Sequence, residues 1–246
     1  AGEVLPELAK VPRLKFVQSQ STGFDGIREA AGPAAGVANA SGVHAAATAE
    51  LALGLILAKL RGIDDAVRAQ QERIWRPSRR SSLADRRVLL IGVGGIGTEI
   101  ARRLKPFEVE LTRIGSAPRK DALGNVHGIA ELPSLAPHHD VVIAVTPLSE
   151  ATRHLIDAAV LAALPDGALV VNVGRGPVVD TDALTAEVLS GRLHCALDVV
   201  DPEPLPRDHP LWGAPNALIT PHVGGNASAF EPRIRRLLSS QLAALA

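Results

Sequence analysis

The feature that most constrains how this chain can fold is a regular alternation of short apolar runs with helix-like segments from Arg87 onward. The apolar runs are aliphatic or β-branched and are bounded by turn residues, as buried parallel strands are. They occupy residues 88–92, 109–114, 141–146, 168–173, 194–200 and 217–220, and helix-like segments occupy residues 96–104, 157–164 and 180–190. Strands that alternate with helices predict an α/β fold with a doubly wound parallel sheet.

The composition limits what such a sheet can bind. The chain has 246 residues, 46% of them hydrophobic, which is ample for a buried core. Its 26 basic residues balance 26 acidic ones, so no overall field attracts nucleic acid or an anionic membrane. The most apolar stretch, residues 45–58, contains Glu50 and is shorter than the roughly 20 residues that span a bilayer. The single cysteine, Cys195, excludes an intrachain disulfide and favours a cytoplasmic location.

A glycine-rich turn follows the first strand of the alternating series. Its sequence is Gly92-Val-Gly-Gly-Ile-Gly97, and it opens a helix-like run. In this setting one glycine permits a tight turn, one lets the backbone approach a pyrophosphate, and one allows close packing of helix on strand. The helix N-terminus then faces the anion. The turn therefore predicts a Rossmann dinucleotide site that includes Gly92, Gly94, Gly95, Ile96 and Gly97.

Three motifs place an arginine, a glutamate and a histidine after successive apolar runs. The motifs are Val171-Asn-Val-Gly-Arg-Gly176, Asp198-Val-Val-Asp-Pro-Glu-Pro204 and Thr220-Pro-His-Val-Gly224. In open α/β sheets, ligands bind beyond the carboxyl ends of the strands. With these flanking residues, the order Arg175, Glu203, His222 resembles the D-isomer-specific 2-hydroxyacid dehydrogenases, and the resemblance covers nearly the whole chain. It implies an NAD(P)-dependent oxidoreductase that transfers a hydride between nicotinamide and a small D-2-hydroxy acid or 2-oxo acid.

These three residue types suit that chemistry. His222 is the predicted general acid and base, because an imidazole titrates near neutral pH. Glu203, between Pro202 and Pro204, would hydrogen-bond the far imidazole nitrogen and fix the tautomer of the ring. Arg175 would bind the substrate carboxylate and carbonyl oxygen through its bidentate guanidinium. The alternative for Arg175 is an exposed or phosphate-contacting side chain.

The end of the second strand bears on the choice of cofactor. NAD-binding sites of this type carry an acid roughly 20 residues after the glycine turn. Aligning the family pattern puts Gly115-Ser116 at that point, with Arg113, Arg119 and Lys120 around it. Ser116 and Arg119 would bind the 2′-phosphate of NADP, so we expect NADP in preference to NAD. The alternative is that these cations only solvate a loop.

The resemblance implies further binding positions. Contacts with the dinucleotide are implied for Thr146, Pro147, Val173, Asp198 and Gly224, with Asp198 at the nicotinamide amide. Thr22 and Gly23 match a family loop whose backbone N–H groups bind the substrate carboxylate. Glycines allow successive N–H groups to point at one anion in this way. No metal site is indicated, because no His or Cys pair has ligand spacing.

The resemblance also predicts the organisation of the chain. Residues 44–225 would form the dinucleotide-binding domain, and residues 1–43 and 226–246 a smaller, flavodoxin-like substrate domain that looks truncated at its N-terminus. Residues 1–43 are too few to fold alone. The helical region over residues 45–60 and 63–75, broken near Gly62, resembles the dimer arm of the family and predicts a homodimer.

Several functions stay open at this point. Within the family, the NADP-like loop favours a glyoxylate or hydroxypyruvate reductase, and D-3-phosphoglycerate dehydrogenase is the alternative. Fold alone does not settle function, and this fold also occurs in corepressors that retain the arginine, glutamate and histidine. A dinucleotide-sensing binding protein is therefore the alternative of another class. An inactive fragment that cannot close its cleft is a further one.

Overall fold

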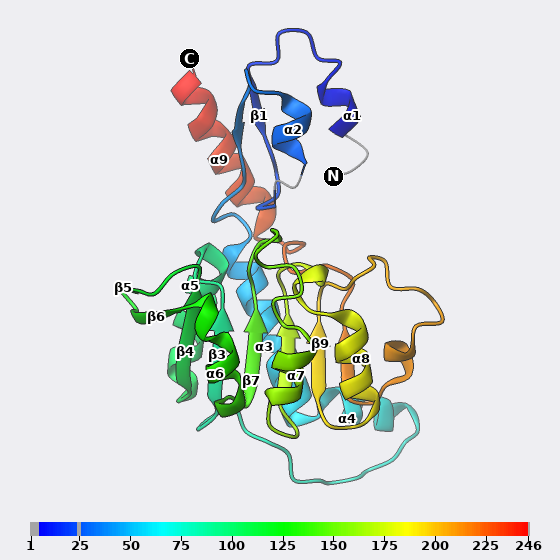
Figure 1. Ribbon diagram of the computed structural model, residues 1–246. Helices are drawn as coiled ribbons and strands as arrows, with labels where there is room; N and C mark the ends of the chain where they lie inside the picture. Colours follow the sequence, from blue (N-terminus) through cyan, green and yellow to red (C-terminus); the bar gives the residue numbers. More distant parts are fainter. Residues whose placement is uncertain (1–4, 24–25, 246) are drawn as a thin grey trace. The chain divides into compact units, whose positions relative to one another are not determined.

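The structure, a computed structural model, describes residues 5–23 and 26–245 and divides into two compact units (Figure 1). The smaller unit comprises residues 1–47 and 225–246, and the larger unit comprises residues 48–224. Among the described residues, no helix combines the length and hydropathy that a membrane span requires.

The larger unit is built on an eight-stranded sheet in the order β10-β9-β8-β7-β3-β4-β6-β5. Every neighbouring pair is parallel except β5 and β6, which form an antiparallel hairpin. The strand order reverses between β3 and β7, where doubly wound sheets bind their ligands. The predicted doubly wound α/β fold is confirmed. The strands are β3 (Arg87–Ile91), β4 (Glu110–Gly115), β5 (Arg119–Asp121), β6 (Gly124–Gly128), β7 (Val141–Ala144), β8 (Leu169–Asn172), β9 (His194–Leu197) and β10 (Ala217–Ile219).

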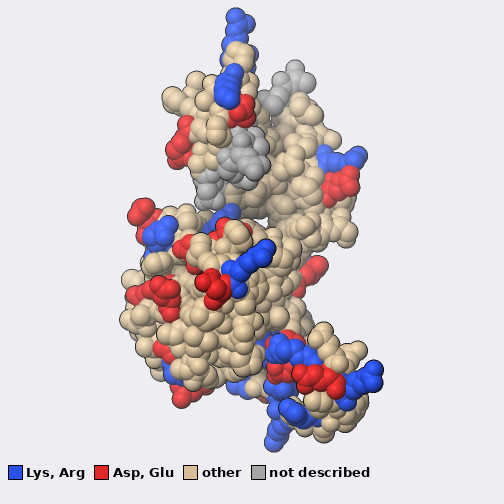
Figure 2. All heavy atoms as spheres, turned by 90° about the vertical axis from the view of Figure 1, so that its right-hand side faces the viewer, with Lys and Arg blue, Asp and Glu red and all other residues tan. Residues whose placement is uncertain are grey.

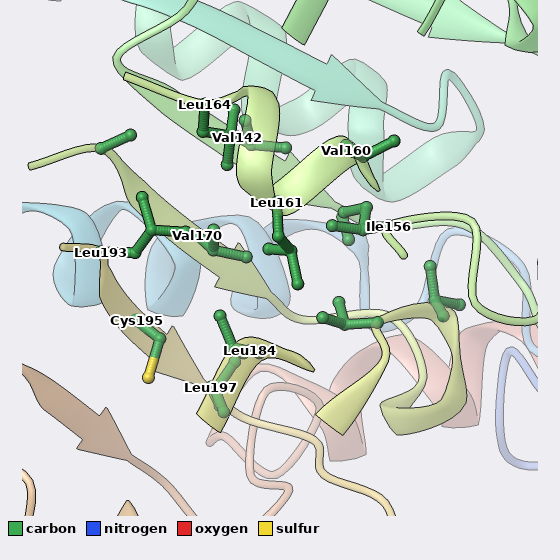
Figure 3. Packing of buried hydrophobic residues seen from close by; sticks show 14 of the residues in the cluster. Val142, Ile156, Val160, Leu161, Leu164, Val170, Leu184, Leu193, Cys195 and Leu197 are labelled. Atoms are coloured by element: carbon green, nitrogen blue, oxygen red, sulfur yellow. The ribbon is translucent and has the colours of Figure 1, made fainter. Parts of the chain in front are cut away.

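Helices bury both faces of this sheet. Residues of α3 (Ala45–Arg61) and α5 (Gly95–Leu104) pack on one face, against Val88 and Leu90 of β3. Residues of α6 (Leu132–Leu135), α7 (Ala158–Ala163) and α8 (Thr181–Leu189) pack on the other, against Leu89 and Ile91. Figure 3 shows part of this second cluster, with Val160 and Leu161 of α7 above Val170 of β8. Because successive strand residues point to opposite faces, strands covered on both sides are apolar throughout.

Local signals explain where several helices begin and end. The Asp157 and Asp180 side chains accept N-cap hydrogen bonds from the third residue of α7 and α8, as aspartate does at helix starts. Gly62, with φ of 62°, separates α3 from α4 (Ile63–Gln71), so the predicted break is confirmed. The prediction that this helix continues to residue 75 is wrong, because Arg73 adopts a left-handed φ of 58°.

The smaller unit draws on both ends of the chain. It contains a parallel pair of strands, β1 (Phe16–Gln18) and β2 (Gly36–Ala38), with helices α1 (Leu5–Leu8), α2 (Ile27–Ala31) and α9 (Phe230–Leu245). Its buried cluster consists of Ala40, Val43 and Ile234, with partly buried residues of α9 packed against it. The His44 ring stacks on Phe230 at a centroid distance of 5.1 Å. The first residue of α9, Phe230, therefore joins the packing of the smaller unit.

Candidate active site

The glycine turn connects β3 to α5 and has two closed and two open positions. Gly92 has φ of 118°, and a Cβ there would lie 2.8 Å from the Val145 carbonyl oxygen. A Cβ at Gly97 would lie 2.0 Å from the Gly92 carbonyl oxygen, so only glycine lets the helix approach the strand this closely. At Gly94 and Gly95, in contrast, a Cβ would meet nothing within 4 Å. The turn thus leaves open space beside the N-terminus of α5, where backbone N–H groups favour an anion.

A buried polar atom follows β7, the strand that pairs with β3. The hydroxyl of Thr146, which follows β7, is buried and has no hydrogen-bond partner among the described residues. Leaving such a group unsatisfied costs roughly 1–3 kcal/mol, which a polar ligand would recover. A Cβ at Gly174 would lie 2.8 Å from the Thr146 carbonyl oxygen, so glycine is also required beside it. The open glycines and this orphaned hydroxyl fit a dinucleotide.

The end of β4 differs in one respect from the expectation. Arg113 is buried and donates to Asp121 Oδ1 at 2.7 Å and Oδ2 at 3.0 Å, and to the Asn125 carbonyl oxygen at 3.2 Å. The prediction that Arg113 belongs to the cations around a 2′-phosphate is therefore wrong, because this guanidinium anchors the β5–β6 hairpin. Its hydrogen bonds hold the pKa of Asp121 below its usual range. Ser116, Arg119 and Lys120 stay exposed beside the strand end.

Arg175 lies in a tightly shaped loop after β8. The buried Asn172 side chain donates to the Arg175 carbonyl oxygen at 2.9 Å and accepts from the Gly174 N–H at 3.0 Å. A Cβ at Gly176 would lie 1.8 Å from the Val200 carbonyl oxygen. The Arg175 guanidinium donates to the Gly174 carbonyl oxygen at 2.7 Å. Sequence reasoning missed Asn172 as the residue that shapes this loop, although its place at a strand end was visible.

Glu203 and His222 form the hydrogen bond that the sequence predicts. His222 Nδ1 and Glu203 Oε1 are 2.5 Å apart, and the two side chains are 47% and 42% exposed. Glu203 follows β9 and His222 follows β10, the adjacent parallel strand. Because Nδ1 is engaged, Nε2 is the ring nitrogen that can exchange a proton with a ligand.

A buried carboxylate holds the histidine loop in place. Asp198, 2% exposed, accepts from Thr220 Oγ1 at 2.6 Å, the Val223 N–H at 2.9 Å and the Gly224 N–H at 2.8 Å. Its carbonyl oxygen accepts from the His222 N–H at 2.8 Å. These bonds keep His222 at a left-handed φ of 51°, a backbone conformation that needs support in a non-glycine residue. Sequence reasoning gave Asp198 only a cofactor contact and missed this second role.

The other predicted positions lie in both units. Pro147 is exposed, and Val173 is buried directly after β8. Thr22 and Gly23 belong to the smaller unit, where the Gly23 N–H donates to Ser21 Oγ at 3.2 Å and the Thr22 hydroxyl is buried without a partner in the described chain. Residues 24–25 of the predicted substrate loop lie outside the described residues. The roles of these positions toward ligands stay predictions.

Metal and thiol chemistry find no geometric basis in the described part of the chain. There, no three His, Cys, Asp or Glu side chains are grouped so that they could hold a metal ion. Cys195 is fully buried in β9, and burial raises the pKa of its thiol to about 12. A thiol in that state is neutral and a poor nucleophile.

Comparison with known proteins gives the family. The family model described as the D-isomer specific 2-hydroxyacid dehydrogenase NAD-binding domain matches residues 53–224. A glyoxylate reductase from Thermofilum pendens is 33% identical over 245 residues, which cover 95% of this chain and 72% of the relative.

Two solved structures are similar over most of their length. One is an NADPH-dependent glyoxylate/hydroxypyruvate reductase from Sinorhizobium meliloti in complex with NADP and malonate. It has a TM-score of 0.85 at 32% sequence identity, and the match covers 95% of this chain and 75% of the reductase chain. The other is a phosphoglycerate dehydrogenase from Lactobacillus plantarum, with a TM-score of 0.72 at 29% sequence identity. The match covers 98% of this chain and 80% of the dehydrogenase chain. With a Rossmann sheet, an open glycine turn and a glutamate–histidine pair at the strand ends, the chain belongs to the D-isomer specific 2-hydroxyacid dehydrogenases, which are NAD(P)-dependent oxidoreductases.

Proposed function

We propose that this protein reduces a small 2-oxo acid, glyoxylate or hydroxypyruvate, to the corresponding hydroxy acid, with NADPH as its preferred cofactor. The observation that carries the proposal is the 2.5 Å contact between His222 and Glu203 at the carboxyl ends of β9 and β10. Arg175 follows the carboxyl end of the neighbouring strand, β8. Relatives named glyoxylate reductase and hydroxypyruvate reductase support this substrate class.

His222 would act on the oxygen of the substrate carbonyl. When bound, the reduced nicotinamide supplies a hydride to the carbonyl carbon. His222 Nε2 gives a proton to the oxygen, which becomes the hydroxyl. Glu203 on Nδ1 fixes the tautomer and the orientation of the ring. The Asp198 carboxylate holds the backbone that carries the His222 ring. The position of the ring therefore does not depend on the exposed His222 side chain alone.

Arg175 would hold the substrate. Its guanidinium can pair with the carboxylate in bidentate geometry, as the ammonium of lysine cannot. The loop that carries it is fixed by Asn172 and by the close approach of Gly176 to Val200. A rigid loop would hold the carbonyl carbon at a constant distance from the nicotinamide, which is a large part of what catalysis requires.

The preference for NADPH rests on the end of β4. No carboxylate stands at Gly115 or Ser116, where one would repel a 2′-phosphate. With Arg113 paired to Asp121, the exposed cations that remain for the phosphate are Arg119 and Lys120. Solved relatives hold NADP or NAD, so both cofactors belong in the test.

The proposal is tested by measuring the decay in absorbance of NADPH and of NADH with each of four substrates: glyoxylate, hydroxypyruvate, pyruvate and phosphohydroxypyruvate. The original protein and His222→Ala are compared. We expect the variant to lose about a hundredfold or more in kcat. Preference for phosphohydroxypyruvate would instead identify a phosphoglycerate dehydrogenase. Tight cofactor binding without turnover of any acid would contradict the proposal and favour the dinucleotide sensor.

We also propose a cytoplasmic homodimer. The supporting observation is that the Ile63 and Val67 side chains of α4 are each 52% exposed, and that of Trp75 is 96% exposed. Burying such groups favours association. The reduced thiol of Cys195 suits the cytoplasm. A monomer in sedimentation at micromolar concentration would contradict the dimer.

A further inference from the structure

A polar cavity lies at the end of the larger unit's sheet that is opposite to Arg175, Glu203 and His222. It has a volume of about 200 Å³. Leu169 and His194, the first residues of β8 and β9, line it, whereas the three proposed catalytic residues follow the carboxyl ends of β8, β9 and β10. The other lining residues are Lys59, Leu60, Arg79, Arg80, Ser81 and Gly167. The cavity is therefore separate from the proposed substrate site.

The lining of this cavity is strongly biased in charge. Three cationic residues, Lys59, Arg79 and Arg80, line it together with His194 and Ser81, and no acidic residue does. Apolar cavities usually serve packing, but a set of donors with no acidic side chain favours a negatively charged ligand. Figure 2 shows Lys and Arg side chains gathered at the lower right of the molecule, with a few acidic side chains among them.

Two of the cations are held in position from outside the cavity. The Lys59 side chain is 4% exposed, and its Nζ donates to Asp64 Oδ2 at 2.8 Å and to the Pro215 carbonyl oxygen at 3.1 Å. Arg80 Nη1 lies 2.8 Å from Asp65 Oδ2. An ammonium has three donors and a guanidinium has five, so both groups keep donors for a ligand. A ligand would meet head groups that are already ordered, which lowers the entropic cost of binding.

The acids behind the cavity do not neutralise its cations. Asp64 forms ion pairs with Lys59 and Arg68. Asp65 forms ion pairs with Arg68 and Arg80, so two carboxylates are shared among three cations. Arg79 adds a further positive charge, and it has no ion pair with any residue that the structure describes. The group as a whole is positive, and an anion in the cavity would balance it.

His194 gives the cavity a group that senses a bound anion. Burial lowers the pKa of its half-buried imidazole, and the nearby Lys59 and Arg80 lower it further, opposed by Asp64 and Asp65. The ring forms no hydrogen bond with another described residue, so its nitrogens are available to a ligand. An anion beside the ring would favour its protonated form.

We propose that this cavity binds a small multivalent oxyanion, as carried by phosphate compounds and by di- or tricarboxylic acids. The proposal does not depend on the proposed reaction, because none of the cavity residues takes part in it. A bound anion would connect the segment of Arg79 to Ser81 with the end of α3 and the start of β9. Inorganic phosphate is the probe for phosphate compounds, and citrate is the probe for di- and tricarboxylic acids.

The experiment measures binding of inorganic phosphate and of citrate to the full chain by calorimetry, with chloride at matched ionic strength as reference. Arg79→Gln removes a cation that has no ion pair, so the variant should fold normally, as circular dichroism would check. A lost charge-assisted hydrogen bond of roughly 1.5 kcal/mol weakens binding about tenfold. Arg76→Gln, in the same segment but outside the lining, is the matched control and should bind as the original protein does.

Phosphate could also bind at the open glycine turn, so a local readout is needed. The His194 C2–H resonance, assigned through its loss in His194→Gln, should shift when phosphate is added to the cavity. A shift with either probe supports the proposal, and the tighter probe names the kind of anion. The proposal is overturned if neither probe moves this resonance at millimolar concentration, or if Arg79→Gln binds as tightly as Arg76→Gln.

Discussion

The ion pairs at the two ends of the larger unit's sheet differ in their exposure to solvent. At the carboxyl ends, Glu203 and His222 are more than 40% exposed, while the buried Asp198 holds the backbone beneath them. At the amino ends, Lys59 and Asp64 are themselves buried, at 4% and 6% exposure of their side chains. An exposed pair on a fixed backbone can exchange protons with a ligand, whereas a buried pair mainly connects elements of the fold.

The largest effect on stability should come from Lys59→Ala. This change leaves the buried Asp64 carboxylate with Arg68 alone and removes a donor from the Pro215 carbonyl oxygen. Breaking a buried ion pair costs roughly 3–5 kcal/mol, and the remaining arginine favours the lower end of that range. Urea unfolding measures the loss, and Lys120→Ala, at an exposed lysine, should stay within about 0.5 kcal/mol. If both variants unfold alike, the buried pair is not what connects α3 to α4.

At the other end of the sheet, Thr220→Val should reduce turnover more than it reduces binding. It removes the 2.6 Å hydrogen bond to Asp198 and frees the loop that carries His222. One such bond contributes roughly 1–3 kcal/mol, so kcat should fall about tenfold while the KM for the 2-oxo acid changes little.

Thr220→Ser keeps the hydroxyl and should restore most of the rate. Thr185→Val, which removes the hydrogen bond to the Thr181 carbonyl oxygen in α8, is the matched control. Equal rates for both valine variants would show that Asp198 does not position the histidine loop.

Arg119→Gln should have a smaller effect, which is a change in the KM for NADPH but not in the KM for NADH. Arg119 is exposed at the strand end, where its guanidinium would meet a 2′-phosphate. A single exposed ion pair contributes roughly 1 kcal/mol or less, so the KM for NADPH should rise several-fold and that for NADH should not change. Arg153→Gln, at an arginine outside the proposed cofactor contacts, should leave both values unchanged. An equal rise for both cofactors would contradict a phosphate contact.

The smallest effect concerns His139, an ionisable group buried at the amino end of β7. Burial lowers its pKa below the 6.5 of a free histidine, and its ring contacts the Leu135 carbonyl oxygen at 2.7 Å and Thr112 Oγ1 at 2.8 Å. Below pH 6.5 the unfolded chain takes up a proton that the folded chain does not, so stability should fall as pH decreases through this range. His139→Gln should flatten the dependence, as measured by urea unfolding between pH 5 and 8. An unchanged slope would mean that other groups cause it.

The sequence predicts the sheet well, because its strands are continuous apolar runs and its helices carry clear caps. The glycine turn was also predictable, because its residues lie within one short motif. The Glu203–His222 hydrogen bond joins two motifs, and it was predictable because the family resemblance implies it. The β5–β6 hairpin was not predictable, because its strands are short and polar. The pairing of Arg113 with Asp121 depends on that hairpin, so its role was predicted wrongly.

The role of Asp198 was missing from the sequence reasoning for a different reason. Its partners Thr220, Val223 and Gly224 follow the adjacent strand, and the register that pairs Leu197 with Ile219 brings them together. A sequence gives strand order only by analogy and gives register hardly at all. Contacts between loops of neighbouring strands therefore need the three-dimensional structure, unless a family resemblance implies them.

The core of the smaller unit has a consequence for synthesis on the ribosome. Ala40 and Val43 pack with Ile234, which is translated only after the whole of the larger unit. Domains can fold as units during synthesis, so the larger unit can complete its sheet while residues before Ala40 still lack their packing partners. We expect the early segment to rely on chaperones or on delayed folding until α9 leaves the exit tunnel, so a segment translated after the larger unit completes the packing of one translated before it.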